Sequence, residues 1–271
     1  IHPHETLQSS ANVEIWEGLS RCAEENEMAL HTYVLHSGGT KLKFEDIPAL
    51  LRRDQLDGIV ILGAVFPSLL DFLRKARVPT VVASNYDLPA PVDQVRIDLV
   101  EGSRSLALRL LEHGHKHIGF LTGGADLLVH QQLYRGFEEV MRKHRIFSRN
   151  LVRLVKEPTL HGIHPADALL KQKPRPTAIF TTHWQEGCQV VVAAIRAGIE
   201  FDSVFEIATG GMGENLDFVY PVLRLNTHPH ELGKKAFERL MELHREPRQE
   251  PKALTVQCSV EAFPSSHLNP K

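Results

Sequence analysis

The residues best suited to bind a small molecule lie beside the predicted strand ends of this chain. His183 and Trp184 directly follow the apolar run 177–181. At that position an indole can stack on the face of a sugar or a base, and an imidazole can donate or accept a hydrogen bond. The alternative is that Trp184 packs on the core and His183 is solvated. The candidate ligand-binding residues are His4, Glu5, Asn85, Tyr86, Gln131, His183 and Trp184.

The N-terminal sequence His2-Pro3-His4-Glu5 contains side chains that could bind a transition metal. No second pair of metal-binding residues with helical or strand spacing converges on it. Hydrogen bonding to a ligand or simple surface exposure is therefore favoured over a metal. A second His-Pro-His sequence at 228–230 precedes a predicted helix and more simply fixes a hinge. We predict no metal site and no cofactor.

The sequence carries no motif that is specific for catalysis. The stretch LTGG at 121–124 lacks the Lys-Ser/Thr of a P-loop and the full GxGxxG pattern, and GGMGEN at 210–215 is equally weak. No GxSxG nucleophile elbow occurs. Carboxylate pairs such as Glu24-Glu25 lie on predicted helix faces, where solvation explains them. We predict no catalytic residues and no enzymatic activity.

The elements that would position these residues alternate between helix and strand. The segment 98–137 is one complete step of this alternation. It has apolar residues at helical spacing over 100–112, and Gly114 can end that helix in the left-handed conformation. A short apolar run at 117–121, a glycine-containing loop and a second helix that includes Leu133 and Phe137 follow. In a parallel α/β sheet, the loop at the carboxyl end of such a strand is the expected place for a ligand.

The same alternation extends along the chain and predicts an α/β fold, with parallel sheets covered by helices on both faces. Strands are predicted at 29–35, 58–63, 80–83, 117–121, 151–155, 177–181, 205–209, 222–225 and 253–260. Helices are predicted at 13–22, 44–51, 67–73, 100–112, from 133 onward, at 165–171, 185–197 and 230–244. The stretch 85–98 is predicted to be a crossing segment.

Length and composition fit a globular chain with two lobes. With 271 residues, of which 42% are hydrophobic and 24% charged, the chain can bury two cores. The net charge of −2 gives no indication of nucleic-acid binding. Cys22, Cys188 and Cys258 are most simply free buried thiols in a reducing compartment. The N-terminus has no signal-peptide pattern, so we expect a cytoplasmic chain or one whose leader has been removed.

A series of short motifs runs along nearly the whole chain. They are DGIVILG at 57–63, VPTVV at 78–82, Asp98, LLEHGHKHIGFLTG at 110–123, YRGF at 134–137, PTAIFTT at 176–182, AIRAGI at 194–199, and Pro229 with ELG at 231–233. In this order they resemble the effector-binding core of the LacI/GalR family of transcriptional repressors, which is similar to type I periplasmic sugar-binding proteins. The stretch 110–123 is the most specific of them.

This resemblance implies two Rossmann-like lobes of the type I periplasmic-binding-protein fold, with a ligand cleft between the lobes and hinge closure on binding. The implied N-terminal lobe is 1–96 plus 229–248, and the C-terminal lobe is 97–228 plus 249–271. It also implies a cytoplasmic homodimer that binds a sugar or sugar-like effector and has no membrane partner. Operator DNA would be bound through a helix-turn-helix domain upstream, which is absent from this chain. The alternative is a periplasmic sugar-binding protein of a transporter.

Four cleft positions depart from the pattern of the sugar-responsive family members. Those proteins have an Arg that binds ligand hydroxyls at the position of Leu133. They have an Asn-Asp pair at the position of His183-Trp184 and an Asp-Arg pair at the position of Ser84-Asn85. A later acidic residue of theirs corresponds to Gly211. These departures imply that the effector is a sugar derivative or a related compound rather than an ordinary neutral monosaccharide.

Overall fold

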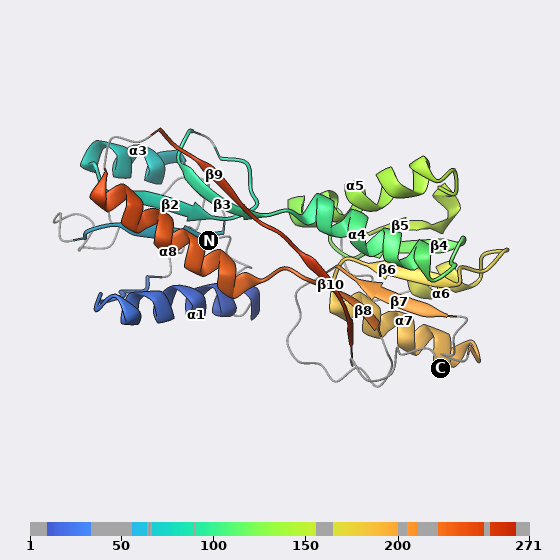
Figure 1. The fold of residues 1–271 in the computed structure, drawn as a ribbon. Coiled ribbons are helices and arrows are strands. Elements are labelled where there is room, and N and C mark those ends of the chain that lie inside the picture. Colours follow the sequence, from blue (N-terminus) through green and yellow to red (C-terminus); the bar gives the residue numbers. More distant parts are fainter. Residues whose placement is uncertain are drawn as a thin grey trace. The chain divides into compact units, whose positions relative to one another are not determined.

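The computed structural model describes residues 10–33, 56–63, 65, 67–88, 90–155, 165–199, 205–210, 222–246 and 250–263. The chain divides into two compact units (Figure 1). Unit 1 takes in Ile1–Ile97 and His228–Val256, and unit 2 takes in Asp98–Thr227 and Gln257–Lys271. The last boundary follows Val256, whereas the resemblance implied residue 248, because residues 253–256 pair with a strand of unit 1.

Unit 1 is built on a four-stranded parallel sheet in the order β1-β2-β3-β9. Its strands are β1 (Ile59–Leu62), β2 (Thr80–Ala83), β3 (Asp93–Ile97) and β9 (Ala253–Val256), and its helices are α1 (Ser10–Glu25), α3 (Pro67–Ala76) and α8 (Pro229–Arg245). Leu69 and Leu73 of α3 pack with Ile61 and Val82 of the sheet. Helix α8 packs on β2 and β3, and α1 packs along α8.

A buried ion pair joins α8 to β3. Arg239 Nε donates to Asp93 Oδ1 at 2.6 Å, and Arg239 Nη1 donates to Glu242 Oε2 at 2.7 Å. Asp93 also accepts the backbone N–H of Lys252, just before β9, at 3.0 Å. Since removal of one partner would leave a buried charge uncompensated, this pair fixes α8 and β9 relative to β3.

Unit 2 is built on a six-stranded sheet in the order β10-β8-β7-β6-β4-β5, parallel except for the β10–β8 pair. Its strands are β4 (Ile118–Thr122), β5 (Val152–Leu154), β6 (Ala178–Thr181), β7 (Glu206–Thr209), β8 (Val222–Asn226) and β10 (Ser259–Phe263). Its helices are α4 (Leu99–Glu112), α5 (Leu128–Lys143), the 3-10 turn η2 (Arg149–Leu151), α6 (Pro165–Leu170) and α7 (Trp184–Arg196).

Alternate residues of these strands bury opposite faces of the sheet, as the two-residue period of a strand requires. Phe120 and Phe180 meet Phe137 of α5, with ring centroids 4.9 and 5.6 Å from its ring. Their neighbours Leu121 and Ile179 belong instead to an apolar cluster with residues of α6 and α7. Helices therefore cover both faces of the sheet.

Helices α4 and α5 approach each other closely. A Cβ added at Gly136 of α5 would lie 2.3 Å from the carbonyl oxygen of Val100 in α4, so only glycine allows this spacing. At the same crossing, Ser103 Oγ donates to the carbonyl oxygen of Leu133 at 2.5 Å.

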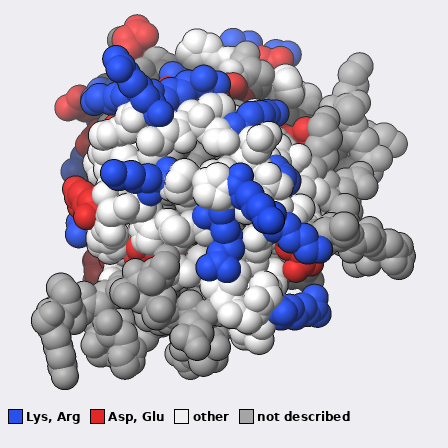
Figure 2. All heavy atoms as spheres, turned by 90° about the vertical axis from the view of Figure 1, so that its right-hand side faces the viewer, with Lys and Arg blue, Asp and Glu red and all other residues white. Residues whose placement is uncertain are grey.

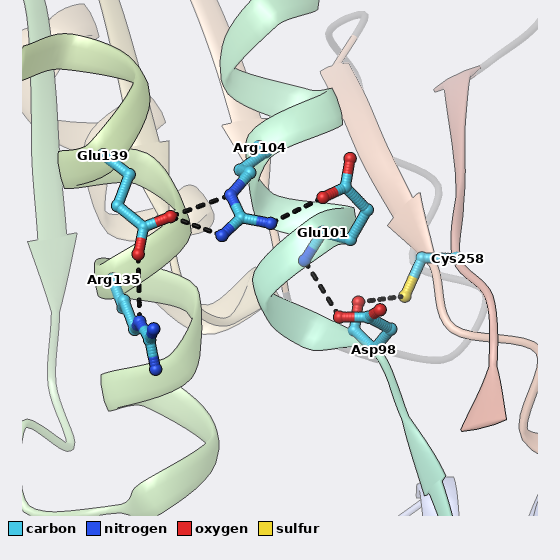
Figure 3. Close-up of polar contacts among 6 residues, drawn as sticks. All are labelled: Asp98, Glu101, Arg104, Arg135, Glu139 and Cys258. Carbon is cyan, nitrogen blue, oxygen red and sulfur yellow. Dashed lines mark hydrogen bonds and ion pairs between the residues drawn. The ribbon is translucent and has the colours of Figure 1, made fainter. Parts of the chain in front are cut away.

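Charged side chains extend this α4–α5 contact (Figure 3). Arg104 of α4 donates through Nε to Glu139 Oε2 of α5 at 2.8 Å and through Nη1 to Glu101 Oε2 at 2.6 Å. Arg135 Nε donates to the other oxygen of Glu139 at 2.9 Å. These hydrogen bonds hold the pKa of Glu139 below its usual range and raise that of Arg104. The network therefore favours one alignment of the two helices.

Most predicted elements are confirmed. The strands predicted at 58–63, 80–83, 117–121, 151–155, 177–181, 205–209 and 222–225 all occur, and so do the helices predicted from 13 and 67 and at 100–112, 165–171, 185–197 and 230–244. Gly114 has a φ of +90°, as expected of a glycine that ends a helix. The helix predicted at 44–51 lies outside the described residues. No helix in the described ranges has the length and apolar character needed to cross a membrane.

Two element predictions were wrong, and one was incomplete. Of the strand predicted at 29–35, the described residues 29–33 form no strand, and all five are exposed. The predicted crossing segment 85–98 does carry the chain from unit 1 into unit 2, which begins at Asp98, but it also contains β3, which was not predicted. The single strand predicted at 253–260 is two strands, β9 and β10, which belong to different units. Between them, Cys258 Sγ donates to the carbonyl oxygen of Asp98 at 3.6 Å (Figure 3).

Lys and Arg side chains gather where the strands of unit 2 begin, on the face shown in Figure 2. We call this the basic edge. Its exposed residues that form no ion pair within the described part of the chain are Lys116, Lys143, Arg145, Arg149, Lys171, Lys173, Arg175 and Arg196. They lie in the loops that precede β4, β5 and β6 and at the ends of α5 and α7.

Candidate functional site

The opposite edge of the unit 2 sheet, where its strands end, collects buried hydroxyl groups. Leu121 of β4 pairs with Thr181 of β6, and Thr181 pairs with Thr209 of β7, so the three strands end side by side. Thr122, Thr181, Thr182 and Thr209 are all buried. We call this the carboxyl edge. It comprises Thr122 at the end of β4 with the two glycines that follow it, residues 182–184 after β6, Gly210 after β7 and the first turn of α5.

Glu186 links two of these loops. It lies in the first turn of α7, where Oε1 accepts the backbone N–H of Gly123 at 2.9 Å and Oε2 accepts that of His183 at 2.5 Å. His183 is the N-cap residue, so the second contact is half of a capping box. Burial raises the pKa of Glu186, although the two N–H groups and a Thr182 hydroxyl oppose this effect. The loops after β4 and β6 are thereby held at a fixed spacing.

A chain of side-chain hydrogen bonds leads from Glu186 to His130. Thr182 Oγ1 lies 3.3 Å from Glu186 Oε2 and 2.8 Å from Thr122 Oγ1. Thr122 Oγ1 lies 3.0 Å from His130 Nδ1 in the first turn of α5, and it accepts the N–H of Gly124 at 3.2 Å. Burial, and to a lesser extent the nearby His183, lower the pKa of His130 to about 4. His130 is therefore neutral near pH 7.

His183 and Trp184 lie at the N-terminus of α7, and both are half-buried. Their ring centroids are 5.8 Å apart. His183 Nδ1 accepts the backbone N–H of Gln185 at 3.5 Å, and burial lowers the pKa of the imidazole. A neutral imidazole that accepts at Nδ1 carries its proton on Nε2 and can donate there. The pair thus offers an aromatic surface beside a hydrogen-bond donor.

The position where the family resemblance places an Arg is apolar in this protein. Leu133 has an exposed fraction of only 2%. Its methyl groups lie beside Gly210, because a Cβ added to that glycine would be 3.1 Å from both of them. Thr209 Oγ1, one residue earlier, is buried and has no hydrogen-bond partner among the described residues. Among the described residues, this part of the edge therefore presents no cation to a ligand.

The candidates in unit 1 follow β2. The carboxamide of Asn85 is fastened to the backbone of Ile97: Nδ2 donates to its carbonyl at 2.7 Å, and Oδ1 accepts its N–H at 2.9 Å. Gln94 Nε2 donates to the carbonyl oxygens of Ser84 and Tyr86 at 2.8 and 2.9 Å. The turn that bears Asn85 and Tyr86 is thus fixed to β3. At least part of the hydrogen-bonding capacity of Asn85 serves the fold.

The structure places three of the seven predicted site residues at the carboxyl edge of unit 2. His183 and Trp184 lie together, and Gln131 is exposed in the first turn of α5, with its Nε2 donating to the carbonyl oxygen of Ala125 at 3.2 Å. Asn85 and Tyr86 lie in unit 1, and His4 and Glu5 lie outside the described residues. The described residues contain no group of three or more His, Cys, Asp or Glu that could hold a metal ion.

Sequence reasoning missed His130, Thr182 and Glu186. Only Glu186 left a readable signal, since an acidic residue three positions after a helix-capping residue is the capping-box pattern. The meeting of Thr182 with Thr122 depends on the pairing of β4 with β6, which the sequence does not specify.

Comparison with known proteins gives a consistent result. Residues 107–262 match the model of the periplasmic binding protein-like domain. The chain is 26% identical to catabolite control protein A of Priestia megaterium over 56% of this chain and 47% of that protein. It is 24% identical to the HTH-type transcriptional repressor PurR of Photobacterium profundum over 78% of this chain and 65% of that protein. The chain thus spans about half to two thirds of the length of these relatives.

A solved structure shares the fold. It is a LacI family transcriptional regulator from Enterococcus faecium with bound ribose. The TM-score is 0.71 at 16% sequence identity, and the match covers 94% of this chain and 93% of the other.

Proposed function

Because this chain belongs to the periplasmic binding protein-like domain family, we propose that it is the effector-binding core of a LacI-type transcriptional regulator. The observation that carries the proposal is the carboxyl edge of unit 2, where a buried hydrogen-bond network joins His183 to His130 and Trp184 lies beside His183. Such an edge is the general ligand position of open α/β sheets. A sensor of this kind needs no catalytic residue, and the proposal is accordingly that the protein is not an enzyme.

The proposed effector is a sugar or sugar derivative without a negative charge at the Leu133 position. Trp184 offers an aromatic face on which an apolar sugar face or a base can stack. Leu133 occupies the position where an Arg guanidinium would bind hydroxyl or anionic groups. The part of the ligand that faces Leu133 should therefore be apolar or absent. The Enterococcus faecium regulator that shares the fold binds ribose, which supports a small polyhydroxylated ligand.

The proposed output is a change in binding to operator DNA. The ligand would favour one of two arrangements of the core, and an attached DNA-binding domain would meet its operator accordingly. Regulators of this kind act in the cytoplasm, and we propose that location for this protein. The whole regulator would therefore have a small molecule and operator DNA as its partners.

A thermal-shift screen tests the ligand site. Sugars, sugar acids and nucleobases are screened against the wild type, Trp184→Ala and the matched variant Trp16→Ala, which changes the other tryptophan of the chain. We expect a compound that raises the melting temperature of the wild type and of Trp16→Ala, and a shift reduced to about a tenth or less in Trp184→Ala. An equal shift in all three proteins would remove Trp184 from the pocket.

We also propose that the protein is a homodimer, with α7 contributing to the interface. Val192 and Ile195 have exposed fractions of 45% and 53%, and they lie on one face of α7. Sedimentation at micromolar concentration should give a dimeric mass for the wild type and a monomeric mass for Val192→Asp/Ile195→Asp. Leu108→Asp on α4, which is 39% exposed in the wild type, is the matched control and should remain dimeric. A monomeric wild type would contradict the proposal.

A further inference from the structure

The hydrogen-bond chain between Glu186 and His130 bears on the kind of ligand that the carboxyl edge can take. Both ends of the chain are ionisable, and both middle members are hydroxyl groups that carry one proton each. The direction in which the two hydroxyls point sets whether Thr122 donates to His130 Nδ1 or accepts from it, and so favours one of the two tautomers of His130. This inference rests on the proposed function in one respect, which is that a ligand binds at the carboxyl edge.

The direction is set at the Glu186 end. An ionised carboxylate only accepts hydrogen bonds. Oε1 of Glu186 accepts the backbone N–H of Gly123, and Oε2 accepts that of His183. Thr182 Oγ1 lies 3.3 Å from Oε2. A hydrogen bond to a charged acceptor is stronger than one between neutral groups. The single proton of Thr182 is therefore best placed toward Glu186.

The remaining contacts follow in order. The oxygens of Thr182 and Thr122 are 2.8 Å apart. With its proton committed to Glu186, Thr182 Oγ1 can only accept the proton of Thr122 in this contact. Thr122, now a donor to Thr182, can only accept from His130 Nδ1, at 3.0 Å, and from the N–H of Gly124. His130 must then carry its proton on Nδ1. A neutral imidazole with the proton on Nδ1 has an accepting lone pair on Nε2.

We propose that Glu186 is a positioning residue that fixes the tautomer of His130 through Thr182 and Thr122, so that His130 Nε2 accepts a hydrogen bond from the ligand. His183 is held in the opposite tautomer by the N–H of Gln185, and its Nε2–H donates. The two imidazoles thus have opposite polarity. The ligand class selected is a neutral molecule that presents a hydrogen-bond donor beside an acceptor, such as a diol or a lactam edge.

The tautomers can be measured without any ligand. Nitrogen-15 NMR of histidine-labelled protein at pH 7.5 distinguishes protonated from unprotonated ring nitrogens, and His130→Asn and His183→Asn assign the signals. We expect His130 to be protonated at Nδ1 and His183 at Nε2. A wild-type His130 protonated at Nε2 overturns the proposal, and this result requires no variant to fold.

Two matched variants test the relay. Thr182→Val removes the link to Glu186, so Thr122 is free to donate to His130 Nδ1 and the proton should move to Nε2. Thr181→Val removes a neighbouring buried hydroxyl that donates to the carbonyl oxygen of Ala208 at 3.3 Å, and it should leave the tautomer unchanged. A His130 signal that is the same in Thr182→Val as in the wild type would also overturn the proposal.

Binding tests the ligand class separately. A diol-bearing sugar or a nucleobase that binds in a Trp184-dependent manner should bind at least tenfold more weakly to Thr182→Val and equally well to Thr181→Val. Comparing the sugar with the nucleobase shows which of these two ligand classes binds. Equal affinity for both variants counts against the relay. Failure of every compound to bind counts against the proposed function, while the NMR result stands on its own.

Discussion

Burial shifts the two ionisable ends of the carboxyl-edge network in opposite directions. It raises the pKa of Glu186 and lowers that of His130 to about 4, because in each case it penalises the charged form. The backbone N–H groups of Gly123 and His183 compensate the carboxylate, whereas no carboxylate in the described part of the chain hydrogen-bonds to His130. A protonated His130 would therefore be costly in the folded protein.

This cost predicts a pH dependence of stability. The pKa of His130 falls from 6.5 to about 4 on folding, so the unfolded chain binds more protons between these values and the free energy of unfolding decreases as the pH falls through them. Between pH 7.5 and 5.0 the wild type should lose about 2 kcal/mol on account of His130. Urea unfolding of His130→Asn should show a smaller loss by about that amount.

The matched control for this measurement is His144→Asn, which changes an exposed histidine of the same unit. It should lose as much stability as the wild type between the two pH values. The assignment to His130 fails if its substitution leaves the pH dependence unaltered.

Single residues were predictable from the sequence where the position depends on one strand. His183 and Trp184 follow β6 after one intervening residue, so their place at the carboxyl edge could be read from the run before them. His130 could not be found in this way, because it reaches the site only through a hydrogen bond to Thr122 of another element. Asn85 was predicted as a ligand residue, and its bonds to the backbone of Ile97 depend on β3, which the sequence reading had missed.

At the scale of elements, the contact between α4 and α5 determines where the first turn of α5 lies, and with it His130. The helices meet at a glycine, where the backbone of one helix nearly touches that of the other. Arg104 and Glu139 hold the same crossing farther along (Figure 3). A change at this crossing should therefore affect both the stability of unit 2 and its site.

Gly136→Ala tests this contact. The new methyl group would lie 2.3 Å from the carbonyl oxygen of Val100, a backbone atom that cannot rotate away, so the helices must separate. We expect a loss of roughly 3 kcal/mol in the free energy of unfolding. Arg135→Ala, the adjacent and exposed position, should cost less than about 1 kcal/mol. Urea denaturation measures both, and equal stability of the two variants would show that the crossing tolerates separation.

The alternation of strands and helices was predictable because most apolar runs are short, buried and bounded by turns. The errors arose where that pattern and the sheet disagree. β3 alternates between buried and partly or fully exposed residues over five positions and directly follows a proline-rich stretch, so its signal was weak. The apolar pattern at 253–260 is continuous although the chain leaves one sheet for another at 257–258, and pattern alone does not show that change.

At the scale of the whole molecule, charge is unevenly distributed. The chain has a net charge of −2, yet the basic edge of unit 2 carries eight exposed Lys and Arg residues that form no ion pair within the described ranges (Figure 2). Some of them lie at helix C-termini, where a cation favours the helix dipole. Those in the loops have no such role, so the edge keeps a local positive potential.

The basic edge should decide how the protein behaves on an ion exchanger. We expect the protein to be retained by a sulfonate resin at pH 7 and low salt despite its negative net charge. Lys171→Glu/Lys173→Glu/Arg175→Glu should elute at lower salt than Arg21→Glu/Lys75→Glu/Arg77→Glu, which has the same net charge and is altered only in unit 1. Coincident elution of the two variants would mean that net charge alone governs retention.

The basic edge and the carboxyl edge are opposite ends of the same parallel strands, separated by about 17 Å for a strand of five residues such as β4. A molecule adsorbed through its lysines and arginines would therefore turn Trp184 and His183 away from the support. A cation-exchange bead would hold unit 2 by the edge opposite its ligand face. Such a column could serve, without a tag or chemical coupling, as an affinity medium for finding the effector.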